Sequence, residues 1–292
     1  MQTRHPVFLV PHAAPFHRGM ALIAVLWIVA ALSVVATGLA RSVRDEARLM
    51  SLSRQSVQAQ AIGDAALSLA LQALAANNQP VTGWMQSQFV YRGVPIQVEV
   101  MPLNGFIDIN GAPGPLLEKL FLVAGGLPPA AAQAAAQAVI QVRNTPDSRG
   151  GRQRFEAEED LLRVPGIDYD LYARLAGLLT TDIRGSGRVN PGAAPIEVLA
   201  VLTGGDVNAA RQIASRRSPG QLGIDTSTFD AALIDTSMVR QLRIQARVPM
   251  ADGSFIRVIR NVEPNARVPD GAPWYTFRTF RSVEPVQRAR NP

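Results

Sequence analysis

Several residue types that carry enzyme chemistry are scarce in this sequence. There is no cysteine, which excludes disulfides, cysteine-bound zinc sites and thiol nucleophiles. The three histidines, His5, His12 and His17, all lie near the amino terminus, and the only lysine, Lys119, lies in an ordinary helical stretch. No glycine-rich phosphate loop follows a predicted strand. The sequence therefore predicts a protein that is not an enzyme, with a carboxylate or lysine mechanism as the alternative left open.

The sequence also lacks a segment in which charges of one sign are concentrated. The chain has 29 Lys and Arg residues against 23 Asp and Glu residues, but the arginines are spread along the sequence and form no block. Scattered arginines are more typical of a solvated surface than of a nucleic-acid-binding face. With 292 residues, of which 47% are hydrophobic, the chain is long enough to bury one or two cores without disulfides.

One segment is long, apolar and uncharged. Met20–Ala40 contains 21 residues without a charge, and as a helix it would extend roughly 30 Å, the thickness of the hydrocarbon core of a bilayer. Arg4 and Arg18 precede it with no acidic residue, which places the amino terminus in the cytoplasm and the bulk of the chain outside. Arg41 and Arg44 follow the span directly and weaken this orientation signal slightly. The segment predicts a single-pass membrane helix over residues 20–40.

The residues before the span, 1–19, form a short basic leader that ends in glycine. A secretory signal carries its small-residue cleavage site after the apolar core, whereas Gly19 stands before it. Arg18-Gly19-Met20 followed by uninterrupted hydrophobic residues resembles a class III prepilin leader. The resemblance implies that a prepilin peptidase recognises Arg18, cuts between Gly19 and Met20, and methylates the new terminus at Met20. The alternative is a plain membrane anchor with a glycine at its edge.

Ala24 stands at the fifth position of the mature chain, where most prepilin-like subunits have a glutamate. In that family the glutamate pairs with the terminal ammonium group of a neighbouring subunit. A buried carboxylate without a partner is costly, so a subunit with no neighbour above it would do better without one. Ala24 therefore favours a subunit at a filament tip.

The apolar helix is predicted to continue beyond the membrane as a stem over residues 41–78. This stretch has no proline, and Asn77-Asn78-Gln79-Pro80 is a stop signal, so the helix from Met20 would reach about 85 Å. Its apolar residues fall near one helical stripe, which predicts the face that packs against other parts of the assembly: Val43, Ala47, Met50, Val57, Ala61 and Leu69.

The rest of the chain predicts an α+β fold in which helices interrupt an antiparallel sheet. Residues 79–112 hold the first strands, with 106–110 as a candidate third strand, and residues 238–281 hold the remaining strands. Between them, residues 113–237 read as a large all-helical domain whose segments are bounded by Gly or Pro. Residues 282–292 are expected to form a loose tail.

Two glycine-containing turns, Leu162–Ile167 and Val189–Leu199, resemble helix-hairpin-helix turns. In DNA-binding examples the backbone N–H groups of such a turn hold a phosphate. Asp168, Asp170 and Asp206 lie beside the two turns and would repel phosphate, and no base-reading pattern accompanies them. The turns therefore favour a structural role, and we expect no nucleic-acid partner, although DNA binding stays an alternative.

A cation site has little support in the sequence. Calcium takes six to eight oxygen ligands, usually from several nearby carboxylates. Asp147 is the one acid in its loop, while Glu158 and Glu159 read as the acidic first turn of a helix. No metal or other cofactor is therefore predicted, and calcium at these three residues is the alternative.

The leader, Ala24 and the interrupted sheet together resemble the K-type minor pseudopilin of type II secretion systems, the general secretion pathway protein K. The most specific parts are RGMALIAVLWIVAALSVVATGLAR and the stretch from Glu159 to Leu202, which contains VNPGAAPIEVLAVL. Family members often have a tryptophan and several aspartates where this chain has Gln141–Asp147, and this difference puts metal binding in doubt.

The resemblance implies a pseudopilin fold that bears a large helical domain and a place at the tip of a periplasmic pseudopilus. The expected location is the bacterial inner membrane, with the bulk of the chain in the periplasm. Its expected partners are other minor pseudopilins, the major pseudopilin, the prepilin peptidase, the inner-membrane secretion platform and the lipid bilayer. A minor pilin of a type IV pilus and a membrane-anchored DNA-uptake protein are the alternatives.

Overall fold

The structure, a computed structural model, describes residues 17–77, 80–146, 150–183, 185–217, 224–266 and 271–284. For residues 17–21 and for Ala40 it describes the helical backbone only. The chain divides into two compact units, Met1–Gln55 and Ser56–Pro292, which are described separately below.

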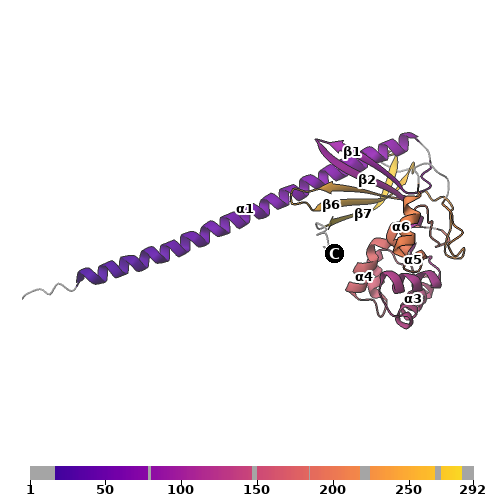
Figure 1. Cartoon of the computed structure of the whole chain (residues 1–292), viewed down its shortest axis with the longest axis horizontal. Coiled ribbons are helices and arrows are strands. Elements are labelled where there is room, and N and C mark those ends of the chain that lie inside the picture. Colours follow the sequence, from indigo (N-terminus) through magenta and orange to yellow (C-terminus); the bar gives the residue numbers. More distant parts are fainter. Residues whose placement is uncertain are drawn as a thin grey trace, which may run out of the picture. The chain divides into compact units, whose positions relative to one another are not determined.

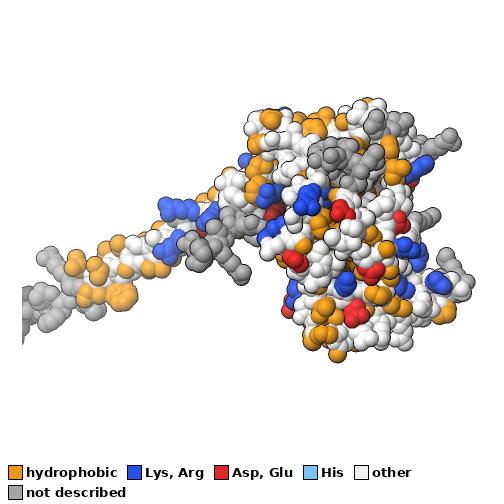
Figure 2. Space-filling view, turned by 45° about the vertical axis from the view of Figure 1, so that its right-hand side comes forward, with side chains coloured by type: hydrophobic (Ala, Val, Ile, Leu, Met, Phe, Trp, Pro, Cys, Tyr) orange, Lys and Arg blue, Asp and Glu red, His pale blue; other side chains and the backbone are white. Residues whose placement is uncertain are grey.

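The first unit contains the amino-terminal part of a long helix, α1 (His17–Asn77). Its apolar side chains are exposed, for example Leu22 at 75%, Trp27 at 71% and Val34 at 72%. From Leu22 onward the helix is long and apolar enough to cross a membrane. Figure 2 shows hydrophobic side chains around this part of the helix, with a group of Lys and Arg side chains beyond them. Side chains this apolar are expected to lie in lipid or against other apolar helices.

The second unit is built on a five-stranded antiparallel sheet with the order β1-β2-β5-β6-β7. Its strands are β1 (Met85–Tyr91), β2 (Val94–Pro102), β5 (Leu242–Pro249), β6 (Phe255–Pro264) and β7 (Trp274–Glu284). Val98 of β2 pairs with Ala246 of β5, so the chain leaves the sheet after β2 and returns beside it much later. Figure 1 shows the helices of this long excursion gathered together. The predicted α+β class with an antiparallel sheet is confirmed.

The carboxyl-terminal part of α1 packs on one face of this sheet. Its buried residues recur every three or four positions and share a core with alternate residues of β2, β5 and β6: Ala59, Ile62, Ala66, Leu67, Ala70 and Leu71. The predicted continuation of the helix to residue 77 is confirmed, whereas Val57 and Leu69 of the predicted stripe are 62% and 46% exposed and do not belong to the face that packs on the sheet. This face combines large apolar residues, Leu67 among them, with small residues such as Ala66 that let the helix approach the sheet closely.

Gly63 marks the closest approach of α1 to the sheet. A Cβ atom at this position would lie 2.7 Å from Val258 Cγ2 and 3.3 Å from Val248 Cγ2. Both contacts are tighter than ordinary van der Waals contact, and valine side chains on a strand have little freedom to move away.

A Gly63→Leu substitution is therefore expected to lower the free energy of unfolding by about 2 to 3 kcal/mol through overpacking. Ala61 is exposed on the same helix, and Ala61→Leu is the matched control, expected to change stability by less than about 0.5 kcal/mol. Urea unfolding of a purified region covering residues 45–292 measures both. Equal stability of the two variants would contradict this account of the helix packing.

The excursion between β2 and β5 forms a second hydrophobic core of its own. Its helices are η1 (Leu103–Gly105), α2 (Gly114–Lys119), η2 (Leu120–Ala124), α3 (Pro129–Asn144), η3 (Glu158–Arg163), α4 (Tyr169–Leu175), η4 (Ala176–Leu178), α5 (Ile196–Leu202) and α6 (Val207–Ser215). We call this part, residues 103–241, the insertion. Its apolar helix faces close around Phe121, Leu161 and Leu199, each almost fully buried.

The insertion also contains a small parallel strand pair, β3 (Ile107–Asp108) with β4 (Leu179–Thr180). The prediction of an all-helical domain is wrong at this point, and residues 106–110 do not add a third strand to the main sheet. Ile107 and Ile109 are fully buried in the core of the insertion, so the alternating pattern that predicted a sheet strand belongs to this second core. At the other end, β7 runs to Glu284, beyond the predicted start of the tail, and residues 285–292 lie outside the described residues.

Candidate functional site

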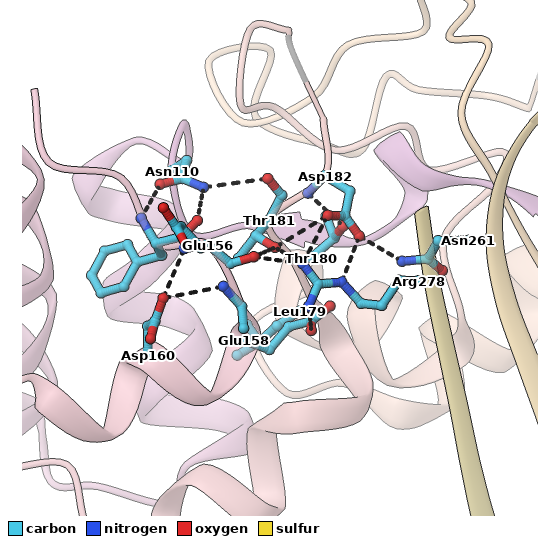
Figure 3. A network of polar contacts seen from close by, with 12 residues as sticks. Asn110, Glu156, Glu158, Asp160, Leu179, Thr180, Thr181, Asp182, Asn261 and Arg278 are labelled. Carbon is cyan, nitrogen blue, oxygen red and sulfur yellow. Dashed lines mark hydrogen bonds and ion pairs between the residues drawn. The ribbon is translucent and has the colours of Figure 1, made fainter. Parts of the chain in front are cut away.

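The site begins on the face of the sheet that points away from α1. In β5, Ile244, Ala246 and Val248 pack against α1, so the alternate residues point to the opposite face. On β5, β6 and β7 that face carries Arg243, Asn261 and Arg278, which meet the insertion. We call this meeting point the junction (Figure 3).

Arg243 is the most buried arginine at the junction, with 6% of the residue exposed. Its Nε donates to Asn261 Oδ1 at 2.9 Å, and its Nη2 lies 3.4 Å from Glu158 Oε1. The guanidinium also lies over the Phe106 ring, 4.2 Å from the centroid, where the ring face attracts a cation. Burial lowers the pKa of Arg243 to about 10, so the group remains charged at neutral pH.

Arg278 makes a two-point contact with Asp182. Its Nε and Nη2 lie 3.0 Å from Asp182 Oδ2 and Oδ1, the paired geometry that suits a guanidinium and a carboxylate. Asn261 donates to the same carboxylate at 2.8 Å. The hydrogen bond with Asp182 raises the pKa of Arg278 above its ordinary value. Figure 3 shows Arg278, Asp182 and Asn261 pointing toward one another across the junction.

Glu158 lies between the two arginines, with only 2% of the residue exposed. Its Oε2 is 3.8 Å from Arg278 Nη1, in addition to the contact with Arg243. Burial raises the pKa of Glu158, and the two positive charges oppose that shift. A buried carboxylate is tolerated where such partners surround it, so the three side chains depend on one another.

The chain around Glu158 is itself fixed by side-chain contacts. Asn110 donates to the Phe155 carbonyl and accepts from the Phe155 N–H, both at 2.9 Å. Asp160 accepts from the N–H groups of Glu156 at 2.8 Å and Ala157 at 3.2 Å, which satisfies donors at the start of η3. Glu158 is therefore presented to the sheet by a short, well-anchored turn. The junction is a structural clamp, in which the charged groups are directed at one another.

Of the three residues considered as calcium ligands, Glu158 contacts two arginines and Glu159 is exposed to solvent. Asp147 lies outside the described residues. Over the described ranges, no three His, Cys, Asp or Glu residues lie together as metal ligands would.

The first glycine-containing turn caps a helix. Gly166 has φ +86°, a conformation that glycine adopts readily, and the Ile167 N–H donates to the Val164 carbonyl at 3.2 Å. Asp168 accepts from the Leu171 N–H at 2.8 Å and so caps the start of α4. A carboxylate thus takes the place that a phosphate would occupy in a DNA-binding turn.

The second turn is tied to the base of the insertion through Asn190. The Gly192 N–H donates to Asn190 Oδ1 at 2.9 Å, and the Ala193 N–H donates to the Asn190 carbonyl at 3.1 Å. The Asn190 N–H in turn donates to the Asn104 carbonyl at 2.6 Å, and the Gly192 carbonyl accepts from Trp84. These N–H groups are used within the protein, which supports the structural role over phosphate binding.

No family model matches the sequence, and no curated protein matches it. Among solved structures, a chain in the crystal structure of the GspK-GspI-GspJ complex from the enterotoxigenic Escherichia coli type 2 secretion system is similar. The two chains share 14% sequence identity with a TM-score of 0.50, over 79% of this chain and 98% of that chain. The chain has a pseudopilin-like fold. The resemblance to a K-type minor pseudopilin is thereby confirmed at the level of the fold.

In this pseudopilin-like fold the predicted processing residues lie at the start of α1. Arg18, Gly19 and Met20 are in its first turns, where the backbone alone is described, and residues 1–16 lie outside the described residues. Ala24 is exposed on the same helix. The junction residues are far from them in sequence and were not predicted. The sequence contains one weak indication of them: Arg243 lies on β5 among the residues that alternate with the apolar ones, which is typical of a position on the face of the sheet opposite the apolar core.

One further buried acid of the pseudopilin-like fold gives a pH-dependent prediction. Asp108 is 3% exposed, and burial raises its pKa to about 6 although Arg143 and Arg154 oppose the shift. Because the native pKa lies above the unfolded value, the proton is bound more tightly in the native state, and stability falls as the pH rises from about 4 to about 6.

An Asp108→Asn variant keeps the acceptor for the Asn110 N–H, which lies 2.9 Å from Asp108 Oδ1, and removes this titration. We expect the variant to be about 1 to 3 kcal/mol more stable at pH 7 and no more stable below pH 4. Denaturant unfolding at intervals across this range measures the difference. The exposed Asp170→Asn is the matched control. A constant difference between Asp108→Asn and the unmodified protein would contradict the assignment.

Proposed function

We propose that this protein is a minor pseudopilin at the tip of a type II secretion pseudopilus, where it acts as a structural subunit without enzymatic activity. It would be held in the inner membrane by α1, with its bulk in the periplasm. A prepilin peptidase would remove residues 1–19. The pseudopilin-like fold supports this proposal, together with the leader and the helix that the sequence places after it.

The observation that carries the proposal is that the two parts of α1 have different surroundings. Its amino-terminal part exposes apolar side chains such as Leu22, Trp27 and Val34, while its carboxyl-terminal part forms the core of the sheet with Leu67 and Leu71. A helix of this kind joins a membrane anchor to a folded domain without a linker. That construction suits a subunit that is drawn from the membrane into a filament.

The tip position is supported by Ala24 and by the insertion. Ala24 provides no carboxylate for the terminal ammonium group of a neighbouring subunit. The insertion adds a second hydrophobic core to a fold whose sheet and helix are already complete. A subunit that repeats along a filament would have to accommodate this extra mass at every step, whereas a single subunit at the end would not.

The partners that we propose are two further minor pseudopilins, because the similar solved structure is a complex named for three components. The test is co-purification of the soluble region, residues 45–292, with the soluble regions of candidate I-type and J-type pseudopilins. We expect a stable complex in size-exclusion chromatography. The major pseudopilin and the minor pilins of a type IV pilus serve as comparisons under the same conditions.

Binding to type IV minor pilins and not to the pseudopilins would favour the pilus alternative. Failure to bind any of these candidates, with each protein shown to be folded by circular dichroism, would overturn the proposed tip complex. Secretion of a reporter protein in cells that lack this chain provides the functional readout, and loss of secretion is the expected result.

A further inference from the structure

The insertion covers only part of the polar face of the sheet. Beside the junction, the open part of that face forms one wall of a cleft with a volume of about 920 Å³. This wall carries Gln97, Glu99, Gln245, Arg247, Arg257 and Glu284. The facing wall is formed by α4, α5 and α6. A water molecule occupies roughly 30 Å³ in the liquid, so the cleft is far larger than a single ion requires and suits a segment of several residues.

The cleft has an excess of positive charge. Five arginines line it against three glutamates: Arg174, Arg211, Arg217, Arg247 and Arg257 against Glu99, Glu197 and Glu284. Two of the glutamates are engaged within the sheet. Glu284 pairs with Arg247 at 3.0 Å and with Arg257 at 3.2 Å, and Glu99 accepts hydrogen bonds from Gln97 and Gln245.

The three arginines of the helical wall are not neutralised in this way. The ion pairs among the described residues, defined by a separation of 4.0 Å or less, include none with Arg174, Arg211 or Arg217. Glu197 is the only carboxylate on the same wall. The helical wall therefore presents three cations and one anion to the cleft.

Arg217 has a buried guanidinium nitrogen without a hydrogen-bond partner among the described residues. This atom is Nε, while Nη2 donates to the Pro191 carbonyl at 2.7 Å. Burial lowers the pKa of Arg217 to about 10. A desolvated cation without an anion costs free energy, and an incoming carboxylate would offset that cost.

We propose that this cleft binds an acidic segment of a partner protein, with carboxylates paired to Arg217, Arg174 and Arg211. The inference rests on the cleft alone and goes beyond the proposed function, because a pseudopilus subunit need not have such a site. The partner is defined by chemistry: an extended stretch rich in Asp or Glu. A cleft in which three arginines of one wall have no ion-pair partner among the described residues matches such a stretch in both charge and size.

The experiment measures the fluorescence anisotropy of a fluorescein-labelled decaglutamate peptide mixed with the full chain in non-ionic detergent at low salt. Arg217→Gln and the double variant Arg174→Gln/Arg211→Gln are each expected to weaken binding by at least about tenfold, the loss of one or more charge-assisted hydrogen bonds. The matched controls are Arg188→Gln and the double variant Arg92→Gln/Arg188→Gln, which remove exposed arginines outside the cleft. We expect these controls to stay within about twofold of the unmodified protein.

Three results would overturn the proposal. One is the absence of peptide binding to the unmodified chain, and another is an equal loss of binding in the control variants, which would indicate attraction to the basic surface in general. The third is complete displacement of the peptide by millimolar inorganic phosphate, which would indicate a site for small anions. Should Arg217→Gln fail to fold by circular dichroism, the double variant of the two exposed arginines decides the matter. None of these results bears on co-purification with pseudopilins.

Discussion

An Arg243→Met variant is expected to lose about 3 to 5 kcal/mol of unfolding free energy, the usual effect of removing one partner from a buried ion pair. Methionine fills much of the same volume over the Phe106 ring but leaves Glu158 buried with Arg278 as its remaining positive neighbour, 3.8 Å away. Asn261 also loses the donor that now lies 2.9 Å from its Oδ1. Denaturant unfolding of residues 45–292 measures the loss.

The pH dependence of this loss distinguishes a stranded charge from simple repacking. Without Arg243 the pKa of Glu158 should rise further, because the largest attraction that opposes its burial is gone. A native pKa above the unfolded value destabilises the protein at high pH and not at low pH. The deficit should therefore be largest at pH 7 and shrink as the pH approaches 4.

Two comparison variants complete this test. The double variant Arg243→Met/Glu158→Gln removes the stranded charge and should recover a substantial part of the stability. The exposed side chain of Arg163 forms an ion pair with Asp160 at 3.2 Å, and Arg163→Met should cost less than about 1 kcal/mol. If Arg243→Met were as mild as Arg163→Met, the junction would not be the clamp described above.

A Gly19→Asp variant is expected to keep its leader completely. The resemblance to prepilins implies a peptidase that cuts after a glycine, where a side chain next to the scissile bond would obstruct the close approach of the enzyme. In cells that contain a prepilin peptidase, the unmodified chain should begin at a methylated Met20, and the variant should retain residues 1–19. Intact-mass measurement of the purified proteins separates the two outcomes.

The control for this prediction is a second glycine in the same apolar helix. Gly38 has no heavy atom within 4 Å of a Cβ built on it, so Gly38→Val is tolerated sterically and should be processed like the unmodified chain. Gly19→Val should behave like Gly19→Asp. If either Gly19 variant matured to the normal mass and secretion continued, the prepilin assignment would be wrong.

The sequence predicts this fold well where a pattern repeats locally. The uncharged run from Met20 and the alternating strands near Val98 and Ile244 are each contained in one short segment, and they gave the helix, the sheet and the α+β class. The face of α1 that packs on the sheet was not predicted, because apolar residues occur on more than one side of this helix: Leu67 is buried and Leu69 is exposed. The buried side is also marked by small residues such as Gly63, which a hydrophobic pattern does not detect.

The junction could not be predicted from the sequence for a different reason. Glu158 lies on η3, which contributes to the core of the insertion, and Arg243 lies on β5, which contributes to the core between α1 and the sheet. They become neighbours only through the pairing of strands that are distant in sequence. In the sequence, Glu158 is indistinguishable from an exposed acid at the start of a helix, which is how it was interpreted. Its neighbour Glu159 does follow that rule and is exposed.

The pairing of β2 with β5 also has a kinetic consequence. Pro102 faces Leu242 across the sheet, so the two strands can meet only after the whole insertion has been brought to compact dimensions. Closing a long disordered loop costs entropy, and contacts between distant segments slow folding. We therefore expect the insertion to fold first and to bring β5 beside β2, with the sheet closing last. Until that step, the hairpin of β1 and β2 would have the hydrogen-bonding groups of the β2 edge unpaired, because β5 is their partner in the finished sheet.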